Sequence, residues 1–144
     1  MDSSIATVSL VKRLHLAARA AIDAALIPFD VSTSQYSVLR CLEDDFELTG
    51  AALARQLFVT AQTMSRTLAG LEQAGLIVRL AGNDNANTTR NRLSAAGLET
   101  VTTCRTVVQT TAREVLSPLS IEEQESFQRA LIRCVEAAEQ LAGD

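Results

Sequence analysis

Four hydrogen-bonding side chains at helical spacing are the residues of this sequence with the clearest chemical use. The apolar positions of this segment recur at three- and four-residue intervals, as in an amphipathic helix. The polar positions between them are Gln62, Thr63, Ser65 and Arg66. Amide, hydroxyl and guanidinium groups on one helix can hydrogen-bond base edges and phosphate oxygens of a duplex. We therefore expect Gln62, Thr63 and Arg66 to reach bases or adjacent phosphates, and Ser65 to hold the backbone. Thr60 is suited to cap this helix and is also counted among the predicted DNA-binding residues.

These residues lie in the basic part of an acidic chain. The net charge is -4 over 144 residues, yet residues 49–92 hold five arginines against Glu72 and Asp84, a net charge of +3. Phosphates attract cations over about a Debye length, roughly 8 Å at physiological salt, so a local surplus can serve a binding surface. The predicted DNA-contacting arginines are Arg55, Arg66, Arg79, Arg90 and Arg92. We assign Arg55 to the backbone phosphates.

Helices and a hairpin are expected to position these side chains. A helix over residues 61–74 ends at Gly75, a residue that tolerates the left-handed conformation. The β-branched run at residues 76–80 and the alternating run at residues 88–93 predict two strands joined by a polar loop. Arg90 and Arg92 share a face by the period of two, so the hairpin should present cations outward, toward phosphates.

Other helices are expected to carry this unit. Ser32 or Thr33 can cap a helix running to about Asp44, and Thr49 can cap a short one. Long helices with apolar stripes are predicted over residues 5–27, over residues 94–117, and after Ser120, which forms a capping box with Glu123. Their apolar faces are broader than one small domain requires. We therefore expect a homodimer and a mostly helical fold.

Composition argues against several classes of protein. The acidic amino end and the interrupted apolar runs indicate neither a secretory signal nor a membrane span, so we expect a cytoplasmic protein. Three widely spaced cysteines, Cys41, Cys104 and Cys134, suggest buried thiols rather than disulfides or a metal site. With one histidine, His15, and no catalytic or phosphate-binding motif, we expect neither an enzyme nor a cofactor.

The order of the elements, together with several local motifs, resembles the multiple antibiotic resistance regulator (MarR) family. The resemblance covers nearly the whole chain and is strongest in the segment that contains Arg66. The matching motifs are SQYSVLRCL at residues 34–42, TGAALARQL at 49–57, VTAQTMSR at 59–66, LEQAGLIVR at 71–79 and LSAAG at 93–97.

The resemblance implies a mostly α, winged helix-turn-helix protein that regulates transcription, with a repressor as the expected form. In a single chain of residues 1–144, residues 32–94 would form the DNA-binding unit with a two-stranded β-hairpin wing. Residues 1–31 and 95–144 would supply long dimerisation helices. Each reading helix would enter the major groove of double-stranded DNA and each hairpin tip would approach the minor groove. A two-fold dimer would meet pseudo-palindromic half-sites about 34 Å apart.

The hairpin tip departs from the family pattern. Family members usually carry an Asp and an Arg there, and the spacing places Asn85 and Asn87 at those positions. The minor-groove contact should then be weaker, or be replaced by neutral hydrogen bonds from Asn. The alternative is a flexible polar turn without a role in DNA binding.

Family ligands imply a small aromatic or phenolic effector near the interface helices. The polar candidates are His15, Tyr36 and Arg40, although His15 also fits a packed or surface histidine. Such a ligand would favour a dimer whose reading helices are wrongly spaced. Two other functions stay open. One is a thiol-based redox sensor, and the other is a winged-helix interaction module whose DNA binding is weakened.

Overall fold

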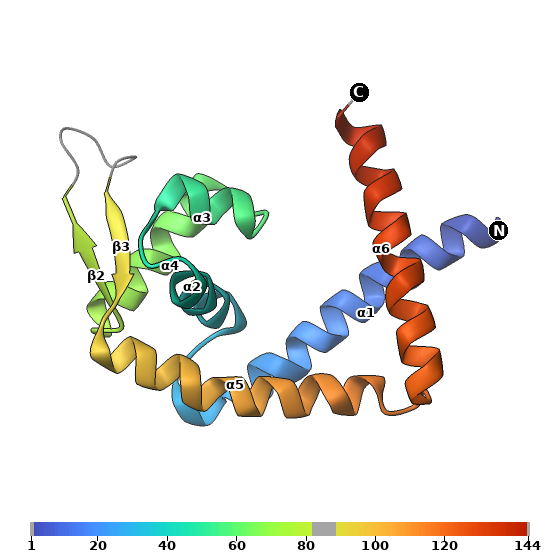
Figure 1. Cartoon of the computed structure of the whole chain (residues 1–144), viewed down its shortest axis with the longest axis horizontal. Helices are drawn as coiled ribbons and strands as arrows, with labels where there is room; N and C mark the ends of the chain where they lie inside the picture. The colour runs from blue at the N-terminus through green and yellow to red at the C-terminus, as the bar shows by residue number, and fades with distance from the viewer. Residues whose placement is uncertain (1, 82–88, 144) are drawn as a thin grey trace. The chain divides into compact units, whose positions relative to one another are not determined.

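The computed structural model describes residues 2–81 and 89–143 (Figure 1). Within these ranges the chain is mainly helical, as the sequence predicted. In chain order the elements are α1 (Ser3–Leu26), the 3-10 helix η1 (Ile27–Phe29), α2 (Thr33–Asp44), β1 (Leu48–Thr49), α3 (Gly50–Gln56), α4 (Ala61–Gln73), β2 (Ile77–Leu80), β3 (Arg90–Leu93), α5 (Ala95–Leu116) and α6 (Ile121–Gly143). The chain divides into two compact units, residues 1–111 and 112–144.

Polar side chains cap the helices at the predicted positions. The Thr60 hydroxyl accepts a hydrogen bond from the Thr63 backbone N–H at 3.1 Å, which fixes the first turn of α4. Ser32 and Gln35 form a full capping box at the start of α2. Gly75 follows α4 with a φ of +74°, a conformation that glycine adopts without a steric penalty. These local signals set the boundaries of α2 and α4.

The wing is part of a three-stranded antiparallel sheet in the order β1-β3-β2. Ile77 pairs with Leu93 in the predicted hairpin, and Leu48 pairs with Asn91 on the other side of β3. The sequence predicted two strands, so β1 is an addition to that prediction. At two residues, β1 is too short to show the alternation by which strands are recognised.

The core of the first unit joins α2, α3, α4 and the sheet to α5. Its buried residues are Leu26, Val31, Tyr36, Val38, Leu39, Leu42, Leu53, Ala54, Met64, Leu68, Leu71, Ile77, Val101 and Cys104. Packing of this kind fixes the rotation of each helix about its axis, because a turned helix would bury polar groups. The face of α4 that points away from the core is therefore determined.

The start of α5 lies against the start of β2 at Gly97. A Cβ atom on Gly97 would be 1.9 Å from the Leu76 carbonyl oxygen, so other side chains do not fit there. Ser94 secures this approach: its N–H donates to Leu76 O at 3.1 Å and its hydroxyl donates to Gly75 O at 2.6 Å. The Gly97 N–H in turn donates to Ser94 Oγ at 3.0 Å. The wing and α5 are thus joined without a flexible linker.

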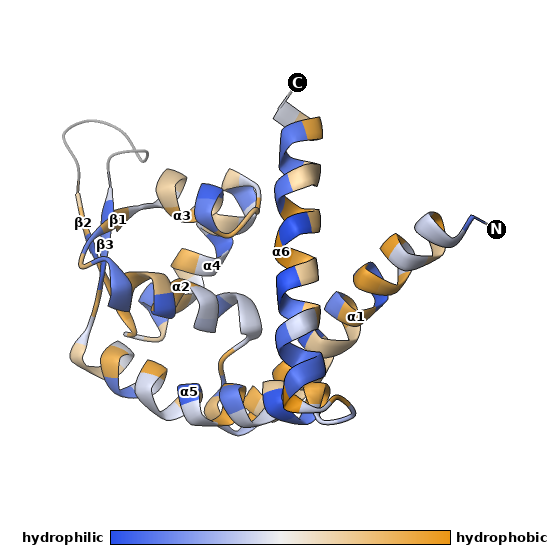
Figure 2. Ribbon diagram, turned by 45° about the vertical axis from the view of Figure 1, so that its right-hand side comes forward, coloured by the Kyte–Doolittle hydropathy of each residue, from blue (hydrophilic) through white to orange (hydrophobic). Residues whose placement is uncertain are grey.

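The second unit begins its last helix with the predicted capping box. Ser120 N–H donates to Glu123 Oε2 at 2.8 Å, and Glu123 N–H donates to Ser120 Oγ at 3.2 Å. Apolar and polar residues alternate along α6, as they do along α1 (Figure 2). None of the described residues of α6 is buried within the chain.

In the ranges 2–81 and 89–143, no helix is both long and apolar enough to cross a membrane. The same ranges contain no group of three or more His, Cys, Asp or Glu residues placed to hold a metal ion.

Candidate nucleic-acid interface

α4 exposes the polar row that the sequence singled out. Its inward face is made of Met64, Leu68 and Leu71, all buried. Its exposed predicted contact residues are Gln62, Thr63, Ser65 and Arg66. The Thr60 hydroxyl also donates to Thr63 Oγ1 at 3.0 Å, so Thr60 acts on the surface by orienting its neighbour. The helix can thus present an amide, hydroxyls and a guanidinium to a partner at its amino-terminal end.

Two arginines accompany this row. Arg55 on α3 and Arg66 on α4 are both exposed. Among the residues that the structure describes, neither takes part in an ion pair. Their charges are available to phosphate oxygens, for which the planar guanidinium is well suited.

The arginines of β3 are in a different state. Arg90 Nη1 lies 3.2 Å from Glu47 Oε2, and Arg92 Nε lies 2.6 Å from Glu47 Oε1. The Arg92 guanidinium also lies over the Phe46 ring, 4.6 Å from its centre. The hydrogen bond from Arg92, followed by the charges of both arginines, lowers the pKa of Glu47. We call these four residues the Glu47 cluster.

The Glu47 cluster changes the prediction made for the wing. Arg90 and Arg92 do share a face, and on that face both are hydrogen-bonded to a carboxylate that the alternation did not indicate. Glu47 lies just before β1 and is brought to β3 by strand pairing. Local periodicity gives no sign of such a contact.

Between these arginines, β3 turns Asn91 inward. Its side chain is buried, and Nδ2 donates to Leu48 O at 3.0 Å. Asn91 pairs with Arg79 across the hairpin, and Arg79 is half-buried. Within the described ranges, Arg79 Nε and Asn91 Oδ1 have no hydrogen-bond partner, and both atoms are buried, out of reach of a phosphate. A phosphate contact from Arg79 would therefore use its terminal nitrogens. Asn85 and Asn87 lie outside the described residues.

The predicted effector residues are not equivalent. His15 on α1 and Arg40 on α2 are exposed, whereas Tyr36 is buried with 5% of its surface accessible. Burial raises the pKa of the Tyr36 phenol, against the opposing influence of the Arg40 charge. Tyr36 is therefore a core residue in this conformation, and its phenol is not presented to solvent.

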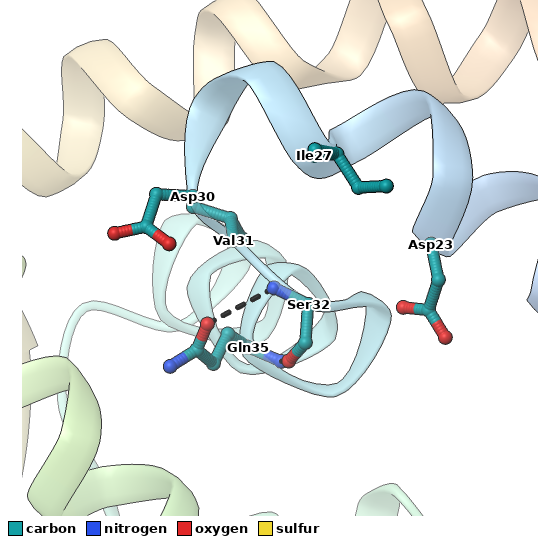
Figure 3. Close-up of a pocket in the computed structure, with 6 residues that line it drawn as sticks. All are labelled: Asp23, Ile27, Asp30, Val31, Ser32 and Gln35. Carbon is teal, nitrogen blue, oxygen red and sulfur yellow. Dashed lines mark hydrogen bonds between the residues drawn. The ribbon is translucent and has the colours of Figure 1, made fainter.

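A shallow pocket of about 440 Å³ opens beside the start of α2 (Figure 3). It is lined by Asp23, Ile27, Asp30, Val31, Ser32 and Gln35, none of which was predicted to bind a ligand. Asp23 accepts hydrogen bonds from the backbone N–H and the hydroxyl of Thr33, each at 2.7 Å. With two carboxylates in its lining, the pocket is unsuited to an anionic aromatic acid.

The cysteines give little support to redox sensing. Burial raises the pKa of the Cys41 and Cys104 thiols, which lowers the fraction of reactive thiolate. Cys134 on α6 is exposed within the chain.

Comparisons with known proteins identify similar chains. A model described as the MarR family matches residues 29–85. The HTH-type transcriptional repressor Rv2887 of Mycobacterium tuberculosis is 31% identical over 122 residues, which cover 85% of this chain and 88% of that protein.

Solved structures are similar over most of the chain. The M. tuberculosis MarR family protein Rv2887 in complex with DNA has a TM-score of 0.72 at 28% identity, covering 88% of this chain and 94% of that one. Its complex with salicylic acid has a TM-score of 0.70 at 30% identity, with coverages of 87% and 93%. A mutant of MarR from E. coli complexed with operator DNA has a TM-score of 0.82, covering 92% and 96%. At 20% identity that likeness concerns the fold.

Proposed function

The chain belongs to the MarR family, and from that premise we propose that it is a sequence-specific, DNA-binding transcriptional repressor of the cytoplasm. The observation that carries the proposal is the exposed polar row of α4, held outward by a buried apolar face on the same helix. The related M. tuberculosis protein, named a transcriptional repressor and solved with DNA, supports the same role.

Each part of the surface has a distinct task in this proposal. Gln62, Thr63 and Arg66 read base edges in the major groove, where amide and guanidinium groups distinguish base pairs by paired hydrogen bonds. Ser65 and Arg55 bind phosphates beside them and set the register of the protein on the duplex. Arg90 and Arg92 contribute less, because part of their charge is already compensated by Glu47.

A homodimer would present two such helices to a pseudo-palindromic operator. Apolar side chains that the chain leaves exposed support this association. On α1 they are Ile5, Val8, Leu10, Val11, Leu14 and Leu16, and on α6 they are Ile121, Ile132, Val135 and Leu141. Exposed apolar surface of this extent is typical of a protein interface. We expect V8E to weaken dimerisation in sedimentation experiments and the neighbouring T7E to leave it unchanged. A wild-type chain that is monomeric at micromolar concentration would contradict the dimer.

Selection of bound duplexes from a random pool tests the function directly. The expected result is a motif with two inverted half-sites about one helical turn apart. R66A should then weaken binding of that motif by about 1–3 kcal/mol, and R66K should recover little of the loss if the guanidinium pairs with a base. R129A on α6 is the control for loss of one positive charge. Absence of any enriched motif at low salt would refute the proposal.

We also propose that a small aromatic or phenolic ligand releases the DNA. The related M. tuberculosis protein solved with salicylic acid supports this idea, and His15 and Arg40 offer exposed polar groups for such a ligand. A panel of aromatic acids and phenols should contain a compound that raises the melting temperature and weakens DNA binding. If His15 and Arg40 contribute, H15A and R40A should reduce both effects. Failure of the whole panel would remove this part of the proposal.

A further inference from the structure

The turn between α3 and α4 contains an aromatic residue in an unusual state. Phe58 has a φ of +55°, in the left-handed region, and 87% of its surface is exposed. Its backbone N–H donates to Arg55 O at 3.4 Å, and the next N–H, of Val59, donates to Ala54 O at 3.1 Å. The turn therefore requires this backbone geometry, whereas the side chain is not held by the core.

Both the positive φ and the exposed ring of Phe58 are unfavourable for the stability of the fold. A Cβ atom in the left-handed region crowds the following carbonyl group, which is why glycine usually occupies such turns. An aromatic ring in water gives none of the stabilisation that burial would provide. Strained residues that gain nothing for the fold concentrate at functional sites.

Two internal comparisons set Phe58 apart. The other non-glycine residue with positive φ among those described is Asp30, a residue type that tolerates this region. The other strongly exposed phenylalanine, Phe46, lies under the guanidinium of Arg92. Within the described ranges, Phe58 alone combines a strained backbone with an exposed aromatic ring.

The place of Phe58 in the fold indicates what its ring meets. It lies two residues before Thr60, the cap of α4, and three residues after Arg55, which we assign to the phosphates. Both neighbours belong to the surface that we propose for DNA. The apolar groups of a duplex are the methyl of thymine, exposed in the major groove, and the deoxyribose carbons.

Resting on the proposed DNA-binding function, we propose that Phe58 is an apolar DNA contact that packs its ring on a thymine methyl group or a deoxyribose. The contact releases no counterion, so it adds affinity without adding to the salt dependence of binding. It would complement Arg55 and Arg66, whose contributions fall as salt increases.

Substitutions that separate strain from apolarity test this role. F58G and F58N relieve the backbone and remove the ring, so we expect the melting temperature to rise by about 2 °C and affinity for the selected operator to fall about tenfold. The slope of log affinity against log salt should stay unchanged. F58L keeps both strain and apolar surface, and should retain most of the affinity.

Several outcomes would overturn the proposal while leaving the DNA-binding function intact. One is wild-type affinity in both F58G and F58N. Another is a loss in F58L as large as that in F58G, which would trace the effect to the turn itself. A third is a weaker dimer in F58G by sedimentation. If the wild-type chain binds no duplex at all, it is the proposed function that fails.

Operators with deoxyuridine in place of single thymines identify the group contacted. If the ring packs on a methyl group, one such replacement should weaken wild-type binding and leave F58G unaffected. If the ring packs on deoxyribose, no replacement should affect the two proteins differently.

Discussion

The arginines of α4 and of the wing differ in whether they are paired with a carboxylate. Arg66 stands on an exposed helix face without an acidic partner among the described residues, whereas Arg90 and Arg92 are both bound to Glu47. A cation that already has a carboxylate partner gains less from a phosphate, because it must share its hydrogen bonds or give them up. We therefore expect α4 to supply most of the sequence-specific affinity and the arginines of β3 to supply a smaller share.

The largest effect should appear at Gly97 of α5, which joins the wing, when it is compared with Gly70 within α4. G97A places a Cβ against the Leu76 carbonyl oxygen, so we expect about 3 kcal/mol or more of lost unfolding free energy. G70A in α4 brings its Cβ within 3.3 Å of the Gln35 Nε2 atom, the end of a side chain that can move, and it improves helix propensity. Its stability should change by less than about 1 kcal/mol. Urea unfolding of both variants measures this, and equal effects would contradict the tight joint at Gly97.

Replacing an arginine by alanine should weaken DNA binding more in α4 than in the wing. R66A is expected to cost about 1–3 kcal/mol of operator affinity and to relax specificity at one base pair. R90A should cost clearly less, because Arg90 is already paired with Glu47. Fluorescence anisotropy with the selected operator and with a scrambled duplex measures both quantities. A larger loss in R90A than in R66A would reverse the assignment of specificity to α4.

Removing the carboxylate of the Glu47 cluster should make the wing more like α4. E47Q releases Arg90 and Arg92 toward the phosphates, so we expect binding to tighten about threefold to tenfold and the salt slope to steepen by about one. E43Q is a matched control, since Glu43 pairs with Arg105 instead. Weaker binding by E47Q would mean that Glu47 orients the arginines for DNA rather than compensating their charge.

The smallest effect concerns the start of α2, a helix that contacts α4. Asp23 accepts two hydrogen bonds from Thr33 at the start of α2, and these bonds lower the pKa of Asp23 below its usual 3.8. A carboxyl whose pKa is lowered in the folded state stabilises the fold when the pH is above its pKa in the unfolded state. This contribution is lost as the pH falls through its pKa in the folded state.

We therefore expect D23A to lose about 1 kcal/mol at pH 7, as for a removed helix cap. The difference from wild type should begin to shrink below about pH 4, where the unfolded wild-type chain takes up a proton at Asp23, and it should be lost once the pH falls below the lowered pKa of the folded state. Denaturant titrations at pH 7 and pH 3 check both points. A deficit that stays constant with pH would assign the loss to packing instead of charge.

Much of the helical framework could be predicted because its signals are local. The hydroxyl of Thr60, the capping boxes at Ser32 and Ser120, and Gly75 act within a few residues, and the apolar period of α4 indicates which side is buried. The exposure of Gln62 and its neighbours follows directly from that period.

Contacts between distant segments could not be predicted in the same way. Glu47 meets Arg92 across a separation of 45 residues, through a strand of two residues that has no detectable pattern. The burial of Tyr36 likewise depends on packing between distant segments, and its role in ligand binding stays a prediction. The positive φ of Phe58 is likewise a property of the turn and not of the residue type.

The close approach at Gly97 has a mechanical consequence. Because Ser94 is hydrogen-bonded to Gly75 and Leu76, we expect the first turn of α5 and the start of β2 to move as one rigid body. A rotation of α5 about its own axis should move the hairpin too, because the close contact between Gly97 and Leu76 leaves no room for independent movement. A movement of the first turn of α5 would therefore displace the sheet as well.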